Sequence, residues 1–350
     1  MNAKKWTISL ISLLLVLVFT FAAVMYFTDP LLQYGTEKSI FSYYEYNEMY
    51  SNPGIAKNYT YDTVLVGTSM IQNTNVDECD KLFNCDMVRL PYSGGTTYNM
   101  KTILDVCFEN NSGIEQVYWE LDQFQILGSS TSPRYPLPDY LYNESFIDDA
   151  SYLLNLDIFY HHTVNNVLGT LLGHSSSAER RGDTLFGTFS KENLLQHYSR
   201  PPVSNNISTF AEYKDSVDAN LNRNILPLIE AHPDTDFTFF FVPFSILYWD
   251  SDLREGIFDA MMDATLYTIQ ALLEYENVEV YFFQDRWEIA TNLDNYKDFS
   301  HYSSEINSYI TKAIASGDGK LAKDTCAETI EAMRSFVHNY DFESIFPRTS

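Results

Sequence analysis

Five short, almost wholly apolar runs recur along the chain, with stretches of helical spacing between them. The runs lie at residues 61–67, 86–92, 115–122, 236–244 and 278–284. A strand that is apolar along its whole length is buried on both faces, as in parallel sheets covered by helices on each side. The sequence therefore predicts a three-layer α/β/α domain around a mainly parallel sheet.

Helical spacing fills most of the gaps between these runs. In residues 97–110 the apolar positions fall on one helical face: Met100, Ile103, Leu104 and Cys107. Further helices are expected at residues 75–84, 209–232, 253–276, 302–316 and 327–338. Residues 124–210 break the alternation and begin with a proline-punctuated stretch. We expect a mostly helical insertion there that covers a face of the sheet.

The N-terminus is different in kind, because residues 6–27 carry no charge and follow two lysines. About twenty apolar residues span a bilayer as a helix, and lysines ahead of the span place the N-terminus in the cytoplasm. A cleaved signal peptide is the alternative, but the segment is longer than a usual signal and no clear cleavage site follows it. We expect residues 1–28 to be a single-pass signal anchor, residues 29–60 an irregular connector, and residues 61–350 an extracytoplasmic domain.

The charge balance limits the possible partners. The chain has 22 Lys and Arg against 47 Asp and Glu, a formal net charge of −25. Binding to nucleic acid needs clustered cations, so no nucleic-acid partner is expected. The same balance disfavours adhesion to an anionic membrane through a basic patch.

The four cysteines are Cys79, Cys85, Cys107 and Cys326. Their spacing matches no metal-binding pattern, so we expect no metal site, and nothing else in the sequence indicates a cofactor. An oxidising compartment would allow Cys79 and Cys85 to pair across a short loop. Buried free thiols fit the sequence as well, and both readings stay open.

Small and polar residues follow the ends of the predicted strands. The first run ends in Gly67-Thr68-Ser69, and Gly94-Gly95 follows the second. Asp122 follows the third run, and the fourth leads into Ser245, Tyr248 and Trp249. Ligands bind at the carboxyl edge of such sheets. A plain turn would also explain the first of these stretches, since Gly, Thr and Ser end many strands.

A D-x-x-H pattern, Asp298 and His301, lies in the loop after the last strand. A carboxylate three residues ahead can accept the imidazole Nδ1–H, which leaves Nε2 free to take a proton. A serine hydroxyl needs such a base to become a nucleophile. The alternative is a helix-capping Asp beside an exposed histidine, because the pattern alone is weak.

Together these motifs resemble those of SGNH/GDSL-type serine hydrolases, over residues 60–125 and 235–312. The resemblance implies a flavodoxin-like sheet, Ser69 as the nucleophile, and Asp298 and His301 as its partners. It also implies an oxyanion hole formed by backbone amides, with a side chain as a weaker candidate: Ser69, Gly94, Gly95 and Asn99.

Two departures from the family pattern are visible. Thr68 replaces the usual aspartate before the serine, which is mild because that residue is outside the triad. The family's third block normally brings an asparagine that donates to the oxyanion, whereas this chain has Asp122. Loss of one such donor raises the barrier by on the order of 3–4 kcal/mol. Asp122 either repels the oxyanion or orients an acceptor hydroxyl, and Asp122→Asn separates the two readings.

The sequence thus favours an extracytoplasmic serine esterase or O-acyltransferase that acts on esters of cell-envelope glycans. The candidates for substrate binding are Asp122, Ser245, Tyr248 and Trp249, and aromatic residues of the insertion could form a sugar cleft or simply pack. The chain is also similar to anchored proteins that work beside acyl-transfer membrane proteins, which implies such a partner. The alternatives are a non-catalytic glycan-binding or assembly protein, and a membrane-tethered scaffold.

Overall fold

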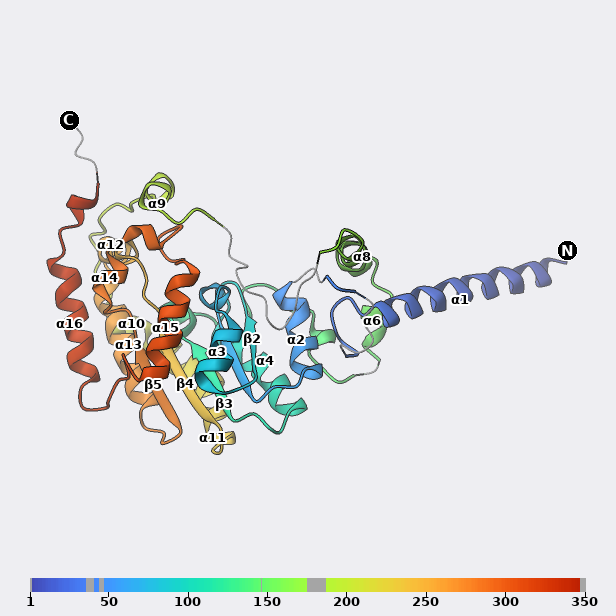
Figure 1. Cartoon of the computed structure of the whole chain (residues 1–350), viewed down its shortest axis with the longest axis horizontal. Helices are drawn as coiled ribbons and strands as arrows, with labels where there is room; N and C mark the ends of the chain where they lie inside the picture. The colour runs from blue at the N-terminus through green and yellow to red at the C-terminus, as the bar shows by residue number, and fades with distance from the viewer. Residues whose placement is uncertain (1, 36–40, 44–46, 146, 175–186, 347–350) are drawn as a thin grey trace. The chain divides into compact units, whose positions relative to one another are not determined.

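The computed structural model describes residues 2–35, 41–43, 47–145, 147–174 and 187–346 (Figure 1). The chain divides into two compact units. Unit 1 consists of residues 1–60, 102–112 and 135–181, and unit 2 of residues 61–101, 113–134 and 182–350. Unit 2 holds the β-sheet, and the described part of unit 1 is helical.

The sheet follows directly from the apolar runs of the sequence. Within the described residues it has five strands in the order β2-β1-β3-β4-β5, and every neighbouring pair is parallel. This is the flavodoxin-like order, whose ligand crevice lies beyond the carboxyl ends of β1 and β3. The predicted fold class is confirmed. The strands are β1 (Thr63–Gly67), β2 (Met87–Pro91), β3 (Gln116–Glu120), β4 (Asp236–Phe241) and β5 (Val278–Phe282).

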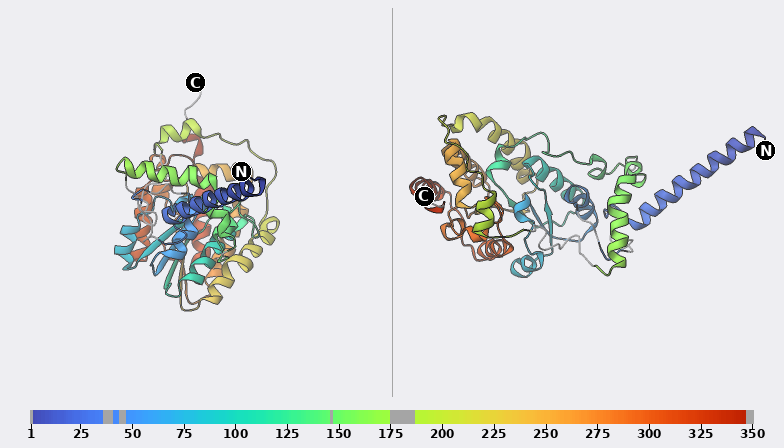
Figure 2. Two further views of the ribbon diagram at one scale, coloured as in Figure 1. Left: turned by 90° about the vertical axis from the view of Figure 1, so that its right-hand side faces the viewer. Right: turned by 90° about the horizontal axis from the view of Figure 1, so that it is seen from above.

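Helices flank the sheet on both faces (Figure 2). One group contains α3 (Val76–Phe83) and α15 (Ser304–Ser316), and the other contains α10 (Phe210–Asn220), α13 (Phe258–Leu272) and α16 (Cys326–Asn339). A π-helical turn, Leu221–Ile225, joins α10 to α11 (Leu226–Ala231), so the predicted helix at residues 209–232 is present as one continuous element. α4 (Thr97–Asn110) begins in unit 2, and its residues from 102 onward belong to unit 1. The remaining helices of unit 2 are α5 (Gln123–Leu127), α9 (Lys191–His197), α12 (Ile246–Glu255) and α14 (Trp287–Ala290), with 3-10 turns at Ser69–Ile71, Leu293–Asn295 and Phe342–Ile345.

Unit 1 begins with α1 (Ala3–Thr28), a helix long and apolar enough to cross a membrane. The end of α1 packs into a small apolar core with buried side chains from both ends of the unit: Met25, Leu31, Leu141, Tyr152 and Ile158. The other described elements of this unit are a 3-10 turn at Asp139–Leu141, α6 (Asp149–Leu153), α7 (Leu156–Ile158), a π-helical turn (Phe159–Thr163) and α8 (Val164–Leu171). They lie within residues 124–210, where a mostly helical insertion was expected.

The segment expected to be an irregular connector contains a helix, α2 (Glu48–Asn58). Its sequence is polar and includes Pro53 inside the helix, so local pattern gave no helical signal. The helix is held by burial instead. Gly54 lies against the backbone of Leu31, where a Cβ would collide with the carbonyl oxygen, and Asn58 donates to the carbonyl of Leu32 at 2.8 Å.

Candidate active site

The turn that carries Ser69 begins where β1 ends. Thr68 is the N-cap of the 3-10 turn Ser69–Ile71, and Ser69 itself is half-buried. The backbone N–H of Thr68 donates to Oε2 of Glu120 at 2.7 Å, and its hydroxyl donates to the same oxygen at 3.0 Å. The nucleophile turn is thus tied to the last residue of the neighbouring strand β3.

Gly67 is required at the end of β1 by this close approach. A Cβ built on Gly67 would lie 2.7 Å from Cβ of Glu120 and 2.9 Å from its Oε2. Such contacts are far inside the normal packing distance, so any larger residue would push β1 and β3 apart. Gly67, which a plain turn would also explain, therefore sets the distance between the serine turn and Glu120.

Glu120 is a buried acid that sequence reasoning missed. Its side chain is fully buried, and burial together with the charge of Asp122 raises its pKa well above the ordinary range, although the hydrogen bonds from Thr68 act in the opposite direction. Oε2 also accepts from Nε2 of Gln125 at 3.2 Å, whereas Oε1 has no partner among the described residues. The available signal was an acidic residue ending an otherwise buried apolar strand.

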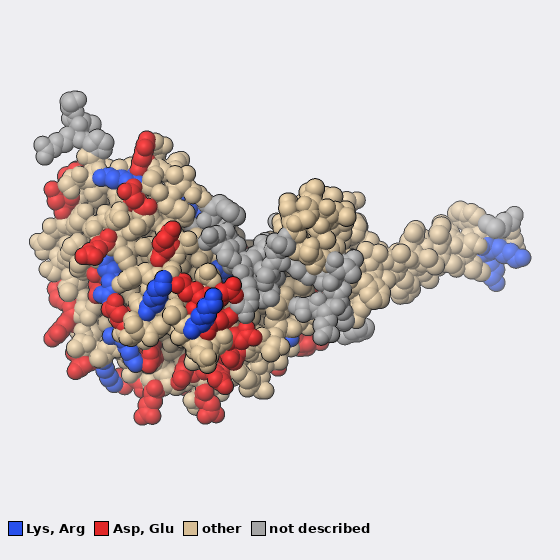
Figure 3. Space-filling model, in the orientation of Figure 1, with Lys and Arg blue, Asp and Glu red and all other residues tan. Residues whose placement is uncertain are grey.

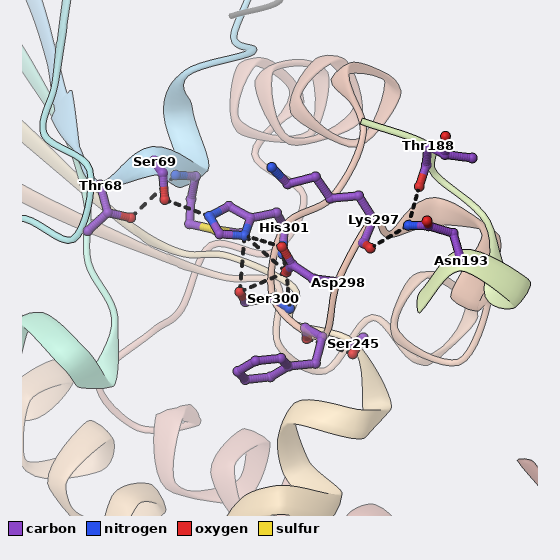
Figure 4. A network of polar contacts seen from close by, with 11 residues as sticks. Thr68, Ser69, Thr188, Asn193, Ser245, Lys297, Asp298, Ser300 and His301 are labelled. Carbon is purple, nitrogen blue, oxygen red and sulfur yellow. Dashed lines mark hydrogen bonds and ion pairs between the residues drawn. The ribbon is translucent and has the colours of Figure 1, made fainter. Parts of the chain in front are cut away.

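The three residues of the predicted triad lie in contact (Figure 4). Oγ of Ser69 is 2.8 Å from Nε2 of His301. Nδ1 of His301 is 2.8 Å from Oδ2 of Asp298 and 3.0 Å from its Oδ1. Burial alone would raise the pKa of Asp298, but the hydrogen bond and charge of His301 hold this pKa well below its ordinary value. An ionised Asp298 fixes the imidazole so that Nε2 faces the serine.

The loop that carries Asp298 and His301 is held by its own backbone. Oδ1 of Asp298 accepts from the backbone N–H of His301 at 2.8 Å and from that of Ser300 at 3.0 Å. The N–H of Lys297 donates to the carbonyl of His301 at 3.0 Å. Tyr296 and Tyr302 form an antiparallel bridge across the loop.

Two side chains from other elements complete the support of this loop (Figure 4). Asn193, on α9, donates to the carbonyl of Lys297 at 2.9 Å. Ser245, ahead of α12, donates to the carbonyl of Phe299 at 2.6 Å. Ser245 was a candidate for substrate binding, and its hydroxyl is buried and used to hold the loop.

The glycine pair after β2 serves two different purposes. Gly94 has φ of +61°, a conformation that favours glycine, and Gly95 donates its N–H to the carbonyl of Tyr92 at 2.8 Å. The amide of Gly95 is therefore used within the turn, which leaves Gly94 as the candidate donor to a ligand. Asn99 uses its side-chain oxygen to accept from the N–H and hydroxyl of Thr96, so only its NH₂ group remains to be offered.

Asp122 has a structural partner. It is the N-cap of α5, and Oδ1 accepts from the N–H of Gln125 at 2.7 Å. Burial raises the pKa of Asp122 to about 6, against the opposing effect of the amides of Gln125 and Phe124. No described contact joins Asp122 to Ser69 or His301. Its role toward a substrate stays a prediction.

The remaining candidates lie in an aromatic group beside the Asp298 loop. Tyr248 stacks on Phe244 with ring centroids 4.2 Å apart, and on Phe299 at 5.8 Å. Phe299 is partly exposed, whereas Trp249 is fully buried behind Tyr248. Tyr248 and Phe299 can therefore line an approach to the site, and Trp249 serves as core.

The insertion aromatics and the cysteines mostly serve packing. Tyr140, Tyr142, Tyr152 and Phe159 all belong to the apolar cluster of unit 1.

All four cysteines are free thiols, so Cys79 and Cys85 do not form a disulfide here. Burial raises the pKa of Cys79 to about 12 and that of Cys85 to about 11. Among the described residues, no group of His, Cys, Asp and Glu is placed to hold a metal ion.

Comparison with known proteins gives little help. No family model matches the chain, and no curated protein matches it. A search of solved structures finds a protein from Streptococcus pneumonia, provisionally described as a platelet activating factor, with a TM-score of 0.39 and 9% identity. The match covers 77% of this chain and 91% of that one.

Proposed function

We propose that the chain is an SGNH-type serine hydrolase or O-acyltransferase that acts on esters of cell-envelope glycans. The single observation that carries this proposal is the contact of Ser69 with a histidine whose second nitrogen is held by a carboxylate. Ser69 and His301 are 232 residues apart in the chain, yet their side chains meet at 2.8 Å at the carboxyl edge of the sheet. Ser69 is also half-exposed, as a nucleophile must be.

In the proposed reaction, Nε2 of His301 accepts the hydroxyl proton of Ser69 while Oγ attacks the ester carbonyl carbon. The amides of Ser69 and Gly94 stabilise the oxyanion. Collapse of this intermediate expels the alcohol, which takes the proton from His301, and leaves the acyl group on Ser69. Water or a sugar hydroxyl then attacks the acyl carbon and gives its proton to His301, which passes a proton to Oγ as the bond between Ser69 and the acyl group breaks.

The donor set for the oxyanion is smaller than in the family that the chain resembles. Where that family has an asparagine, the third strand here ends in Glu120 and leads to the helix-capping Asp122. Burial and the charge of Asp122 raise the pKa of Glu120, which disfavours a negative charge on this residue behind the serine turn. We expect slow turnover with simple esters and a preference for an acceptor that supplies further contacts.

The test is reaction of the full chain, in detergent, with a fluorophosphonate probe. Oγ of Ser69 should displace fluoride and become phosphonylated, and mass spectrometry should find the adduct on this residue. Ser69→Ala should abolish labelling, and His301→Ala should slow it by about 10²- to 10⁴-fold because the general base is lost.

The matched control is His338→Ala. His338 also contacts a carboxylate, Asp259 at 3.0 Å, but none of its described contacts is to a serine. Labelling should be unchanged in this variant. Adducts on another residue, or equal labelling of the wild type and Ser69→Ala, would instead favour the second candidate, a non-catalytic glycan-binding or assembly protein on the same fold. The observation that favours this second candidate is the lack of the asparagine that donates to the oxyanion in the family that the chain resembles.

The location and partner belong to the same proposal. With α1 as an uncleaved anchor, the site would face the extracytoplasmic side, where envelope glycans are found. A membrane protein that supplies acyl groups would then be a suitable partner.

A further inference from the structure

α7, the π-helical turn and α8 form one helix, residues 156–171, which exposes apolar side chains and buries polar ones. In a soluble protein the apolar side of a surface helix faces the core. Here Ile158 is buried in the apolar core, but every buried position from His162 onward is polar or small, and Asn166 is 0% exposed. Most exposed positions are apolar, and Leu171 is 78% exposed; the exceptions are Asp157, His161 and Asn165.

The buried polar side has specific partners in unit 1. Asn166 donates to the carbonyl of Pro30, and the hydroxyl of Thr163 lies 3.6 Å from the sulfur of Met25. The hydroxyl of Thr170 accepts from the N–H of Ser42 at 3.1 Å. These contacts fix which side of the helix faces the protein, so its apolar side is held outward.

The outward side is a continuous apolar stripe that extends past both ends of the helix. Asp157 is the one charged residue between positions 154 and 172, and it lies 3.4 Å from His161 at the start of the helix. In Figure 3 the surface of α8 is free of charged atoms. The exposed apolar side chains are Leu154, Leu156, Tyr160, Val167, Leu168, Leu171 and Leu172.

This stripe continues onto the membrane-spanning candidate. The rings of Phe21 and Phe159 are 5.3 Å apart, and an apolar groove of about 590 Å³ lies between α1 and α6–α7. Leu17 and Val18 line the groove on one side, and Leu154 and Leu156 line it on the other. The α8 axis crosses that of α1 at an oblique angle, as Figures 1 and 2 show together.

The depth of the groove follows from the helix rise. A hydrocarbon core of about 30 Å takes about 20 residues at 1.5 Å each. Counted from the basic start of α1 at Lys5, this span ends at Met25. Phe21 then lies about 6 Å inside the hydrocarbon. Interfacial helices bury their apolar faces to a depth of about 5–10 Å.

We propose that residues 154–172 form a second membrane element, an interfacial helix whose exposed leucines and apolar groove are covered by lipid acyl chains. The helix lies in the membrane face where α1 ends. This inference rests on α1 as a span and not on the serine site. Two apolar contacts with the bilayer would hold unit 1 in a fixed orientation, which a single helix cannot do.

The test places the photoreactive side chain p-benzoylphenylalanine at Leu171 or Leu168 of the full chain, reconstituted in phosphatidylcholine vesicles. After irradiation, mass spectrometry should find lipid adducts at both positions. Position Phe19, an exposed residue within α1, is the positive control. Position Glu109, an exposed residue of α4 in the same unit, is the negative control.

Lipid adducts at 171 and 168 in a yield close to that at 19, and several-fold above that at 109, would support the proposal. Adducts at 19 without adducts at 171 and 168 would overturn it while α1 remained a span. Absence of adducts at all positions would overturn both the interfacial helix and α1 as a membrane span. Repeating the irradiation in membranes of the expressing cells tests for a protein occupant, since a protein adduct at 171 in place of lipid would also overturn the proposal.

Discussion

One oxygen of Glu120 accepts three hydrogen bonds, from the N–H and hydroxyl of Thr68 and from Nε2 of Gln125, while the other oxygen has no described partner. Burial and the charge of Asp122 favour the neutral carboxylic acid, whereas the donors directed at one oxygen favour the charged form. The hydrogen bonds to Thr68 make the residue a clamp that positions the serine turn.

Glu120→Gln should preserve this clamp, since the amide oxygen can accept the same three bonds. Glu120→Ala should lower the free energy of unfolding by about 1–3 kcal/mol or more, because the N–H of Thr68 would be left buried without an acceptor. Chemical denaturation of the detergent-solubilised chain measures both. Equal losses in the two variants would contradict the clamp.

The pH dependence of stability offers a separate check on Glu120. In the unfolded chain this side chain releases its proton above the ordinary value of 4.5, but in the folded chain the raised pKa retains it. Folding then takes up a proton, so the stability of the wild type should fall as pH rises above about 4.5 and through the raised pKa of the folded state. The Glu120→Gln variant lacks this proton and should give a flatter curve. Identical curves would mean that Glu120 is ionised in the folded protein.

At the scale of elements, the Asp298 loop depends on a serine outside it. Ser245→Ala removes the buried hydrogen bond to the carbonyl of Phe299, which should cost about 1 kcal/mol of stability. Small displacements of a base are costly to reaction rates, so fluorophosphonate labelling of Ser69 should slow by about tenfold. Labelling kinetics in parallel with thermal unfolding measure the two effects.

Ser316→Ala, at the exposed end of α15, is the matched control and should change neither quantity. The probe carries no sugar. If Ser245 contacted only a glycan substrate, labelling of the Ser245→Ala variant would therefore equal that of the wild type.

The elements that the sequence predicts well are those whose signal is local. A strand buried on both faces needs a continuous apolar run, and the first run, residues 61–67, contains β1 (Thr63–Gly67) at its end. The residues at which strands end are predicted less well. The third run was expected to reach Asp122, but β3 ends at Glu120, and the five-residue helix α5 begins directly after Asp122. So short a helix leaves no periodic pattern to recognise.

The site shows the same division between local and tertiary signals. The sequence could predict that Ser69 and the D-x-x-H pair lie close together, because turns after parallel strands meet at one edge of the sheet. Glu120 was missed because its role depends on Gly67 and Thr68 of a neighbouring strand. The helix at residues 156–171 was expected only as part of an insertion, since its outward leucines have the same spacing as inward ones would have.

At the scale of the whole molecule, the end of α1 is part of the folded structure. Met25 is 0% exposed in the core of unit 1. Asp29 accepts from the hydroxyl of Tyr152 at 2.8 Å and from the N–H groups of Gln33 and Tyr34. Met25 would be lost from this core if a signal peptidase cut after it. We therefore propose that the anchor stays attached, which goes beyond what the apolar length of α1 indicates.

Met25→Ala should destabilise unit 1 by about 2–5 kcal/mol, because it empties a fully buried site. Val16→Ala is the matched control, since Val16 is exposed on α1 and its environment should be lipid. Limited proteolysis of unit 1 in detergent should distinguish the two variants.

In cells, a reporter fused to the C-terminus should be active outside the cytoplasm and should stay with the membranes after alkaline extraction. N-terminal sequencing should find the chain uncut. A released product that begins just after Met25, with unit 1 still resistant to protease, would show that Met25 is dispensable and that α1 is only a signal.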